Sequence, residues 1–140
     1  MTDNKLGGTC ACGSVAYEIS TPFQFFQYCH CSRCRKTSGA AHAANILLTQ
    51  EQFTWTKGEE LVNRWEHPDA ERFCNSFCTV CGSKLPWLTR SGESYLVPAG
   101  TLDDSPAVSP ERNIFWKSKA EWYQQVGELP IFDESPVLAK

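Results

Sequence analysis

Long hydrophobic runs and an excess of positive charge are both missing from this sequence. No apolar stretch approaches the roughly 20 residues that a membrane-spanning helix needs, and the first ten residues, MTDNKLGGTC, lack the basic and apolar segments of a secretory signal. The formal net charge of −3 gives no general attraction to nucleic acid or anionic lipid. We therefore expect a cytoplasmic protein that binds neither membranes nor nucleic acid.

Linker-like segments are missing too, since no stretch is rich in Gly and Ser, rich in Pro, or a long block of like charge. The 140 residues amount to about one domain, enough for a single modest core. With 41% hydrophobic and 21% charged residues, the composition is that of an ordinary globular protein. We expect one domain, residues 1–140, with one functional site.

Signals for helices are few, and most of the pattern indicates short strands separated by turns. In SVAYEIS, apolar residues alternate with smaller or polar ones, as is typical of a half-buried strand. Strands are expected on these grounds at 14–20, 40–48, 59–67, 71–77, 84–88 and 94–100. Ser32 and Thr49 can each cap a short helical turn, and residues 118–126 permit two turns. The sequence predicts a mainly β fold with short helical turns.

Two proline-containing stretches, DDSPAVSPERN and GELPIFDESPVL, interrupt regular structure near the C-terminus. Between them lie four aromatic residues, Phe115, Trp116, Trp122 and Tyr123. We expect this segment to wrap over the core and bury those rings. The alternative is that the rings form a wall of a substrate site.

Cysteine is the residue that the chain has in abundance, with eight in all. Cytosolic thiol buffers oppose structural disulfides, which favours metal binding or thiol chemistry. Apart from Cys74, the cysteines fall in three clusters: Cys10 and Cys12; Cys29, Cys31 and Cys34; and Cys78 and Cys81.

A glycine follows the second cysteine of the first and last clusters, at Gly13 and Gly82. Glycine there lets the backbone take a left-handed turn and aim N–H groups at sulfur. We expect these two clusters to form one closed zinc site, and four thiolate ligands in tetrahedral array leave no room for substrate. The site would be structural, with Cys10, Cys12, Cys78 and Cys81 as ligands.

The middle cluster differs, because Cys34 is followed by Arg and Lys instead of Gly and Ser. On an extended segment Cys29 and Cys31 point to one side and His30 to the other, so Cys34 rather than His30 can complete a triad. Three protein ligands and an open position are typical of a catalytic zinc, whose fourth place takes water or a substrate thiolate. A thiol bound there would be deprotonated at neutral pH.

The segment that surrounds and follows the third cysteine of this triad is rich in hydrogen-bond donors. Its side chains can bind the carboxylates of a peptide-like thiol by charge-assisted hydrogen bonds. The alternative is that the cations only compensate the negative charge of a zinc–thiolate cluster. The residues concerned are Arg33, Arg35, Lys36 and Ser38.

Cys74 leaves the coordination of the second site open. If Cys74 joined the triad, both sites would be closed and structural. In an extended RFCNSFC segment, however, it need only be a small buried residue, and this is the interpretation we adopt. His42 is kept as a candidate proton shuttle, since neither it nor His67 has partners at metal-ligand spacing.

Three cysteine motifs in order, GGTCACGSVAYEI, CHCSRCRKTSGA and FCTVCGSKLPW, resemble those of the glutathione-dependent formaldehyde-activating enzyme family, which includes the centromere protein V-like proteins. The tail NIFWKSKAEWYQQVGELPIFDESP is also similar to that family's C-terminal segment. The resemblance implies a small, zinc-stapled, Mss4-like (β-tent) fold with two Zn²⁺ ions. Carried over by position, it puts the structural zinc on Cys10, Cys12, Cys78 and Cys81, and the catalytic zinc on Cys29, Cys31 and Cys34.

The named reaction of that family joins glutathione and formaldehyde to give S-hydroxymethylglutathione, formally a carbon–sulfur lyase reaction run in reverse. The resemblance therefore implies an enzyme whose partners are a small-molecule thiol such as glutathione and an aldehyde. A non-catalytic interaction module stapled by two structural zincs is the main alternative. A thiol–disulfide redox protein is a third, since CxxC alone is a weak signal. Nothing in the sequence marks an oligomeric interface.

Overall fold

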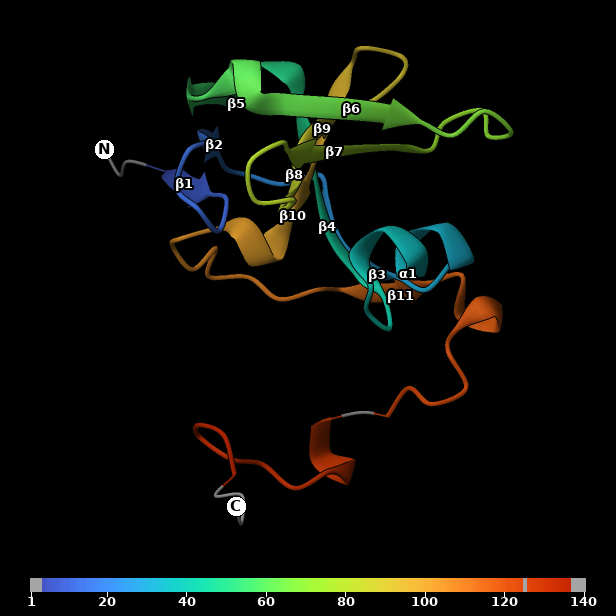
Figure 1. The fold of residues 1–140 in the computed structure, drawn as a ribbon. Helices are drawn as coiled ribbons and strands as arrows, with labels where there is room; N and C mark the ends of the chain where they lie inside the picture. The colour runs from blue at the N-terminus through green and yellow to red at the C-terminus, as the bar shows by residue number, and fades with distance from the viewer. Residues whose placement is uncertain (1–3, 125, 137–140) are drawn as a thin grey trace.

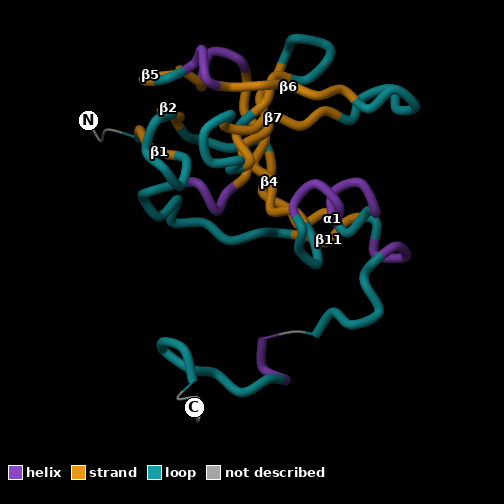
Figure 2. Tube along the Cα trace, viewed as in Figure 1, coloured by secondary structure: helices purple, strands orange, loops and turns teal. Residues whose placement is uncertain are grey.

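Strands make up most of the regular structure, as Figure 2 shows for a computed structural model of the chain. The structure describes residues 4–124 and 126–136. Within these ranges the strands are accompanied by one α-helix, α1 (Ser32–Ser38), and short 3-10 turns. The predicted mainly β fold class is confirmed. The seven residues of α1 are too few to cross a bilayer, and no other helix in the described ranges is long and apolar enough to do so.

The strands form three sheets (Figure 1). The first sheet has the order β1 (Lys5–Thr9), β2 (Ala16–Ser20), β5 (Phe53–Lys57). The central sheet has the order β11 (Arg112–Ile114), β3 (Phe25–Cys29), β4 (Ala43–Thr49), β10 (Ser94–Pro98), β9 (Trp87–Leu88). The third sheet has the order β6 (Val62–Glu66), β7 (Cys74–Cys78), β8 (Lys84–Leu85). All pairings are antiparallel except that of β11 with β3.

The 3-10 turns lie between strands or after the last of them. Their bounds are η1 (Gln50–Gln52), η2 (Glu59–Leu61), η3 (Ala99–Thr101), η4 (Trp116–Ser118) and η5 (Val126–Glu128). The first of them begins where the sequence predicted, because Thr49 and Gln52 form a reciprocal capping box.

The two faces of strand β4 have different surroundings, because successive side chains of a strand point to opposite faces. Ile46 and Leu48 are fully buried on one face, in the main hydrophobic core. That core also contains Tyr17, Ile19, Phe53 and Val97. The other face of β4 carries Ala43, Asn45 and Leu47, and it is therefore available to line a site.

Six predicted strands are present in the structure with shifted ends. The segment 84–88 forms two short strands instead of one, because Pro86 between them has no N–H to donate to a ladder. Four further strands, β1, β3, β5 and β11, were not predicted. Strand β1 contains Gly7 and Gly8, which carry no strand signal, and it is held by its pairing with β2.

The predicted helical turn after Ser32 is α1, but its cap is Cys31. The Sγ of Cys31 accepts a hydrogen bond from the backbone N–H of Cys34 at 3.3 Å. The two turns permitted at 118–126 do not form in the described part of that segment, which contains the last residue of η4, one turn at 121–122, irregular chain and the first residue of η5. Residue 125 lies outside the described residues.

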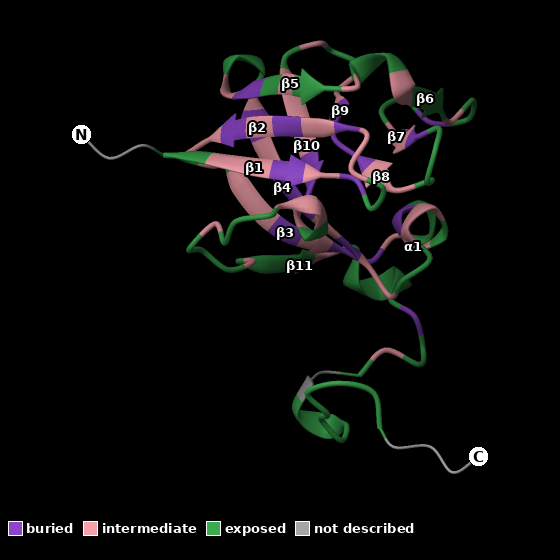
Figure 3. Cartoon of the chain, turned by 60° about the vertical axis from the view of Figure 1, so that its left-hand side comes forward, coloured by how far each residue is buried: buried purple, intermediate pink, exposed green. Residues whose placement is uncertain are grey.

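The expectation that the C-terminal segment buries its rings was wrong. Phe115 is 61% exposed, Trp116 42% and Trp122 68%, and the chain after η4 extends away from the sheets (Figures 1 and 3). Phe115 has a positive φ of 56°, which turns the chain away from the sheet directly after β11. Of these four rings, only Tyr123 is half-buried. It packs edge-on against His30 and His42.

Because only one face of β4 lies in the core, truncating neighbouring side chains of this strand should reduce stability by different amounts. Leu48→Ala should lower the free energy of unfolding by about 2–5 kcal/mol, because it leaves a cavity in the core. Leu47→Ala, on the half-buried opposite face, should cost clearly less. Urea denaturation of both variants at a fixed zinc concentration measures the difference. Equal losses would contradict the placement of the core on a single face of this strand.

Candidate metal centres

The first and last cysteine clusters meet in space. The sulfurs of Cys10, Cys12, Cys78 and Cys81 all lie within 4.8 Å of one another, and the group can hold a metal ion. Cys10 and Cys12 are 3.6 Å apart, and Cys12 and Cys78 are 4.0 Å apart. Four sulfurs arranged tetrahedrally at about 2.3 Å from zinc are separated by about 3.8 Å, so the spacing fits this ion.

The two turns that supply these sulfurs depend on glycine. Gly13 and Gly82 have positive φ values of 79° and 76°, as the sequence predicted. The N–H of Gly13 donates to the carbonyl of Cys10 at 3.0 Å, and the N–H of Gly82 donates to that of Cys78 at 2.8 Å. Each glycine therefore closes a tight turn that brings two sulfurs to the same side.

This cluster joins the turn between β1 and β2 to the turn between β7 and β8. Cys10 and Cys78 are buried with Val15 and Leu85 in a small hydrophobic cluster. The N–H of Val15 also donates to the sulfur of Cys10 at 3.3 Å, which offsets negative charge on that sulfur. A metal ion here would have four protein ligands and would tie distant parts of the chain together.

The middle cluster brings together the three predicted sulfurs. Cys29 ends β3, Cys31 caps α1 and Cys34 lies in the first turn of that helix. Their sulfurs lie within 4.8 Å of one another, and this group too can hold a metal ion. Among the described residues, no fourth Cys, His, Asp or Glu belongs to it.

Without a metal ion, the three thiols of this group cannot all be ionised. The pKa of Cys31 is lowered strongly, because Cys29 and Cys34 donate hydrogen bonds to its sulfur and backbone N–H groups add to them. The pKa of Cys34 is raised, because its proton is held in those bonds and burial and like charge oppose its ionisation. Metal binding must therefore displace protons from this group.

A cavity of about 760 Å³ opens beside the middle cluster, and all three of its cysteines line it. The free face of the central sheet supplies Phe25, Gln27, Asn45 and Leu96. Residues 69–73 form another part of the wall, and Trp87, Ile114 and Phe115 add to the apolar lining. None of the described lining residues belongs to the first cluster. Of the four tail rings, only Phe115 is part of this wall.

The predicted substrate contacts lie on different sides of α1. Arg33 lines the cavity beside the triad, whereas Arg35, Lys36 and Ser38 do not belong to its lining. Ser38 donates to the carbonyl of Cys34 at 2.7 Å and lines a smaller cavity of about 270 Å³. The sequence reasoning missed Arg72, which also lines the main cavity.

Lys84 was also missed. Its ammonium donates to the Thr37 hydroxyl at 3.1 Å and lies over the ring of Trp87, 4.9 Å from its centre. Burial lowers the pKa of Lys84, and the nearby Cys34, Cys31 and Cys29 oppose that shift. Lys84 is thus a cation close to the triad. It lies there because β8, which begins at Lys84, runs close to α1 in the folded chain.

The histidines are not part of either sulfur group. His30 is fully buried and its Nε2 donates to Oδ1 of Asn113 at 2.9 Å, on the side away from the triad. His42 donates from Nδ1 to the carbonyl of Ala43 and stacks on Tyr28. Burial lowers the pKa of His42, which lines the smaller cavity and not the one beside the triad. Its role as a proton shuttle therefore gains no support.

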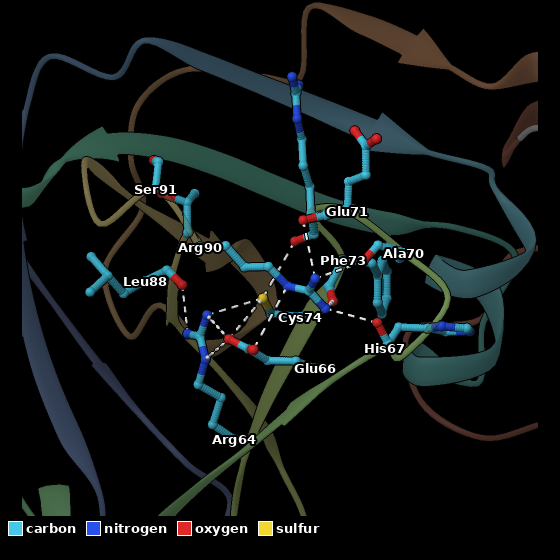
Figure 4. Close-up of polar contacts among 12 residues, drawn as sticks. Arg64, Glu66, His67, Ala70, Glu71, Phe73, Cys74, Leu88, Arg90 and Ser91 are labelled. Atoms are coloured by element: carbon cyan, nitrogen blue, oxygen red, sulfur yellow. Dashed lines mark hydrogen bonds and ion pairs between the residues drawn. The ribbon is translucent and has the colours of Figure 1, made fainter.

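Cys74 has partners other than the triad. It is 1% exposed, and its sulfur accepts a hydrogen bond from Nη2 of Arg64 at 3.0 Å. Its thiol faces the carbonyl of Arg72 at 3.4 Å. Among the described residues Cys74 belongs to neither metal-capable group. It lines the cavity as a buried thiol held by an arginine (Figure 4).

Arg90 holds the loop of residues 67–73, part of which lines the cavity, and Figure 4 shows its hydrogen bonds. Its guanidinium donates to four backbone carbonyls, those of His67, Ala70, Glu71 and Phe73. The carboxylate of Glu66 lies 2.9 Å from Nη2 of Arg64 and 3.9 Å from Nε of Arg90, so it joins the two cations. This network holds a loop without regular structure in one place beside the cavity.

Comparison with known proteins places the chain in a family. The profile of the family described as "Glutathione-dependent formaldehyde-activating enzyme" matches residues 5–118. The chain belongs to this family. The resemblance inferred from the three cysteine motifs is confirmed.

Two further proteins are similar to this chain, one in sequence and one in structure. A curated protein of Halomonas elongata, provisionally named a glutathione-dependent formaldehyde-activating enzyme, is 29% identical over an alignment of 129 positions, and the match covers 85% of this chain and 80% of that protein. The crystal structure of a Rhodobacter sphaeroides protein, solved in a structural genomics project, matches with a TM-score of 0.60 and 25% identity. The match covers 77% of this chain and 98% of that one.

Cysteine variants should show that the two cysteine groups bind metal and that Cys74 does not. Cys34→Ser should lose one of two zinc ions and largely keep the fold, whereas Cys81→Ser should unfold the chain, because a closed zinc site supplies folding free energy. Cys74→Ser should keep both ions, since Cys74 lies outside both groups. Metal counting together with circular dichroism measures these outcomes. Loss of an ion from Cys74→Ser would make Cys74 a ligand.

The hydrogen bonds of Arg90 predict that the 67–73 loop becomes less stable when the guanidinium group is removed. Arg90→Lys keeps the charge but cannot reach four carbonyls, because an ammonium is a point donor. We expect hydrogen exchange of the 67–73 amides to become at least tenfold faster, corresponding to about 1.4 kcal/mol of lost local stability. Mass spectrometry of exchanged peptides measures this change. Exchange at the wild-type rate would show that other contacts hold the loop.

Proposed function

We propose that the protein is a zinc enzyme of the carbon–sulfur lyase type that joins glutathione, or a related thiol, to formaldehyde or a similar electrophile. One observation carries the proposal: three convergent cysteine sulfurs line a cavity of about 760 Å³, and the fourth nearby cysteine is engaged by Arg64 instead. Family membership supports the same reaction class. The reaction also suits the cytoplasm, where thiols are kept reduced.

The donor set of the triad fits zinc, since soft thiolates at this spacing are among its preferred ligands. Cys29, Cys31 and Cys34 would hold the ion. Zinc bound by three sulfurs supplies an open position and lowers the pKa of a thiol placed there. The first cluster, with four sulfurs, would hold a second zinc with a structural role.

The remaining residues of the cavity would bind and orient the thiol. Arg33 and Arg72 both line the cavity, where guanidinium groups can pair with the two carboxylates of glutathione. Phe73, Trp87 and Phe115 would exclude water from the reacting atoms. Arg35, Lys36 and Ser38 remain predicted contacts without a place in this lining.

The proposed chemistry is an addition to a carbonyl group. The thiolate sulfur attacks the carbonyl carbon of formaldehyde, so a carbon–sulfur bond forms while the π bond of the carbonyl breaks. The oxygen then takes up one proton, which balances the proton lost by the thiol, to give S-hydroxymethylglutathione. The contribution of the chain is to gather a charged thiol and a small electrophile in one cavity, which raises their effective concentration.

Zinc K-edge absorption with and without glutathione tests the proposal. We expect mixed sulfur and oxygen or nitrogen coordination in the purified protein, moving toward all sulfur when glutathione is added. Cys34→Ser, which removes the second ion, should abolish the change, and oxidised glutathione, which has no thiol, should not cause it.

The contrary outcome would be all-sulfur coordination from the start, unmoved by glutathione. It would close both sites and favour the non-catalytic module stapled by two structural zincs. Product formation, followed by the carbon signal of S-hydroxymethylglutathione, then decides whether the spectroscopic change belongs to catalysis.

A further inference from the structure

Lys84 places a positive charge between the two cysteine groups. Its side chain is half-buried, and its ammonium donates a hydrogen bond to the Thr37 hydroxyl at 3.1 Å and lies 4.9 Å from the centre of the Trp87 ring. Among the described residues, no carboxylate forms a salt bridge with this ammonium. A cation that is partly withdrawn from water is unfavourable unless an opposite charge lies close by. A negative partner for Lys84 is therefore to be expected.

The contacts of Lys84 lead to the triad. Thr37, which accepts its hydrogen bond, belongs to α1, the helix that carries Cys34. Lys84 also lines the smaller cavity together with Ala43, and Ala43 packs against Cys29 and Cys34. Burial lowers the pKa of Lys84, and the negative charges of the triad oppose this shift. The thiolates of the triad are thus the counter-charge that the structure offers to this ammonium.

The charge of the zinc-loaded triad matches that of one lysine. Three thiolates carry three negative charges and Zn²⁺ carries two positive ones, so one negative charge is left over. The side chains of Arg33 and Lys36, on α1, are exposed, and water weakens the effect of their charges on the sulfurs. Lys84 is half-buried and acts through surroundings of lower dielectric constant, so its effect on the triad is the stronger one.

We propose that Lys84 is a positioning residue of the second metal centre, whose ammonium supplies the counter-charge that stabilises zinc on the triad. A site with three protein ligands has one metal–sulfur bond fewer than the first cluster, and the neighbouring cation helps it to keep its ion. The inference rests on the part of the proposed function that puts zinc on the triad. It does not depend on which thiol or electrophile reacts there.

Zinc affinity tests the proposal without any measurement of turnover. The two ions are titrated by competition with a chromophoric chelator, and the ion that Cys34→Ser lacks is the one on the triad. Lys84→Met keeps the length of the side chain but not its charge, and it should weaken zinc binding by the triad about 10- to 100-fold. Lys84→Arg keeps the charge and should stay within about threefold of the wild type. The affinity of the first cluster should not change in either variant.

Two further variants control for net charge and for folding. Lys117→Met makes the same change at an exposed lysine and should bind zinc as the wild type does. Thr37→Val removes the hydroxyl that holds the ammonium and should weaken zinc binding by the triad about threefold. Combined with Lys84→Met, it should cause no further loss, because the hydroxyl acts through the lysine. Thr37→Val carries the test if circular dichroism shows that Lys84→Met does not fold.

A spectroscopic signature separates a charge effect from a packing effect. Cobalt(II) in place of zinc gives a charge-transfer band from sulfur to metal. Removing a cation beside the sulfurs raises the energy of their electrons, so the triad's band should move to longer wavelength in Lys84→Met. It should return toward the wild-type position in Lys84→Arg. A purely structural role of Lys84 would weaken binding without moving the band.

The contrary outcomes are distinct. Unchanged zinc affinity of the triad in Lys84→Met, with both ions bound, would overturn the role of Lys84 and leave the proposed function intact. Equal losses in Lys84→Met and Lys84→Arg would do the same, because they would indicate packing instead of charge. Absence of a second zinc ion from the wild-type protein at saturating zinc would overturn the proposed function, and this inference with it.

Discussion

Strand β4 packs the hydrophobic core on one face and forms the floor of the main cavity with the other, and the placement of the candidate site depends on this division. Ile46 and Leu48 hold the strand in the core, so Ala43 and Asn45 must face the opposite side. Antiparallel pairing with β3 then sets Cys29 beside Ala43, at the edge of the floor. A slip of one residue would send Asn45 into the core and the apolar side chains into the cavity.

Cysteine clusters and arginine hydrogen bonds hold different parts of the structure around the cavity. Two groups of cysteines gather at turns, where tight backbone geometry brings sulfurs together and metal binding can displace their protons. The part of the wall around residues 69–73 has no such group, and Arg90 and Arg64 hold it through backbone carbonyls, Glu66 and the sulfur of Cys74. Cys74 therefore resembles a ligand by residue type but serves as an acceptor for a guanidinium.

The sequence-based predictions succeeded where the signal is local. The glycines after Cys12 and Cys81 predicted left-handed turns, and the alternation in β2 predicted which of its residues are buried. They failed where the cause lies elsewhere in the chain. Strand β1 contains two glycines and forms because β2 is beside it, α1 is capped by a cysteine sulfur, and the tail leaves the core at Phe115.

By itself, the sequence determined the family, the mainly β class and the grouping of seven cysteines, because close spacing and flanking glycines are properties of short segments. Only the tertiary structure decided that Arg33 and not Lys36 faces the cavity, that Arg72 and Lys84 come close to the triad, and that Cys74 pairs with Arg64. Such facts depend on strand register and on loops packed across the sheet, and these follow from contacts between residues far apart in the chain.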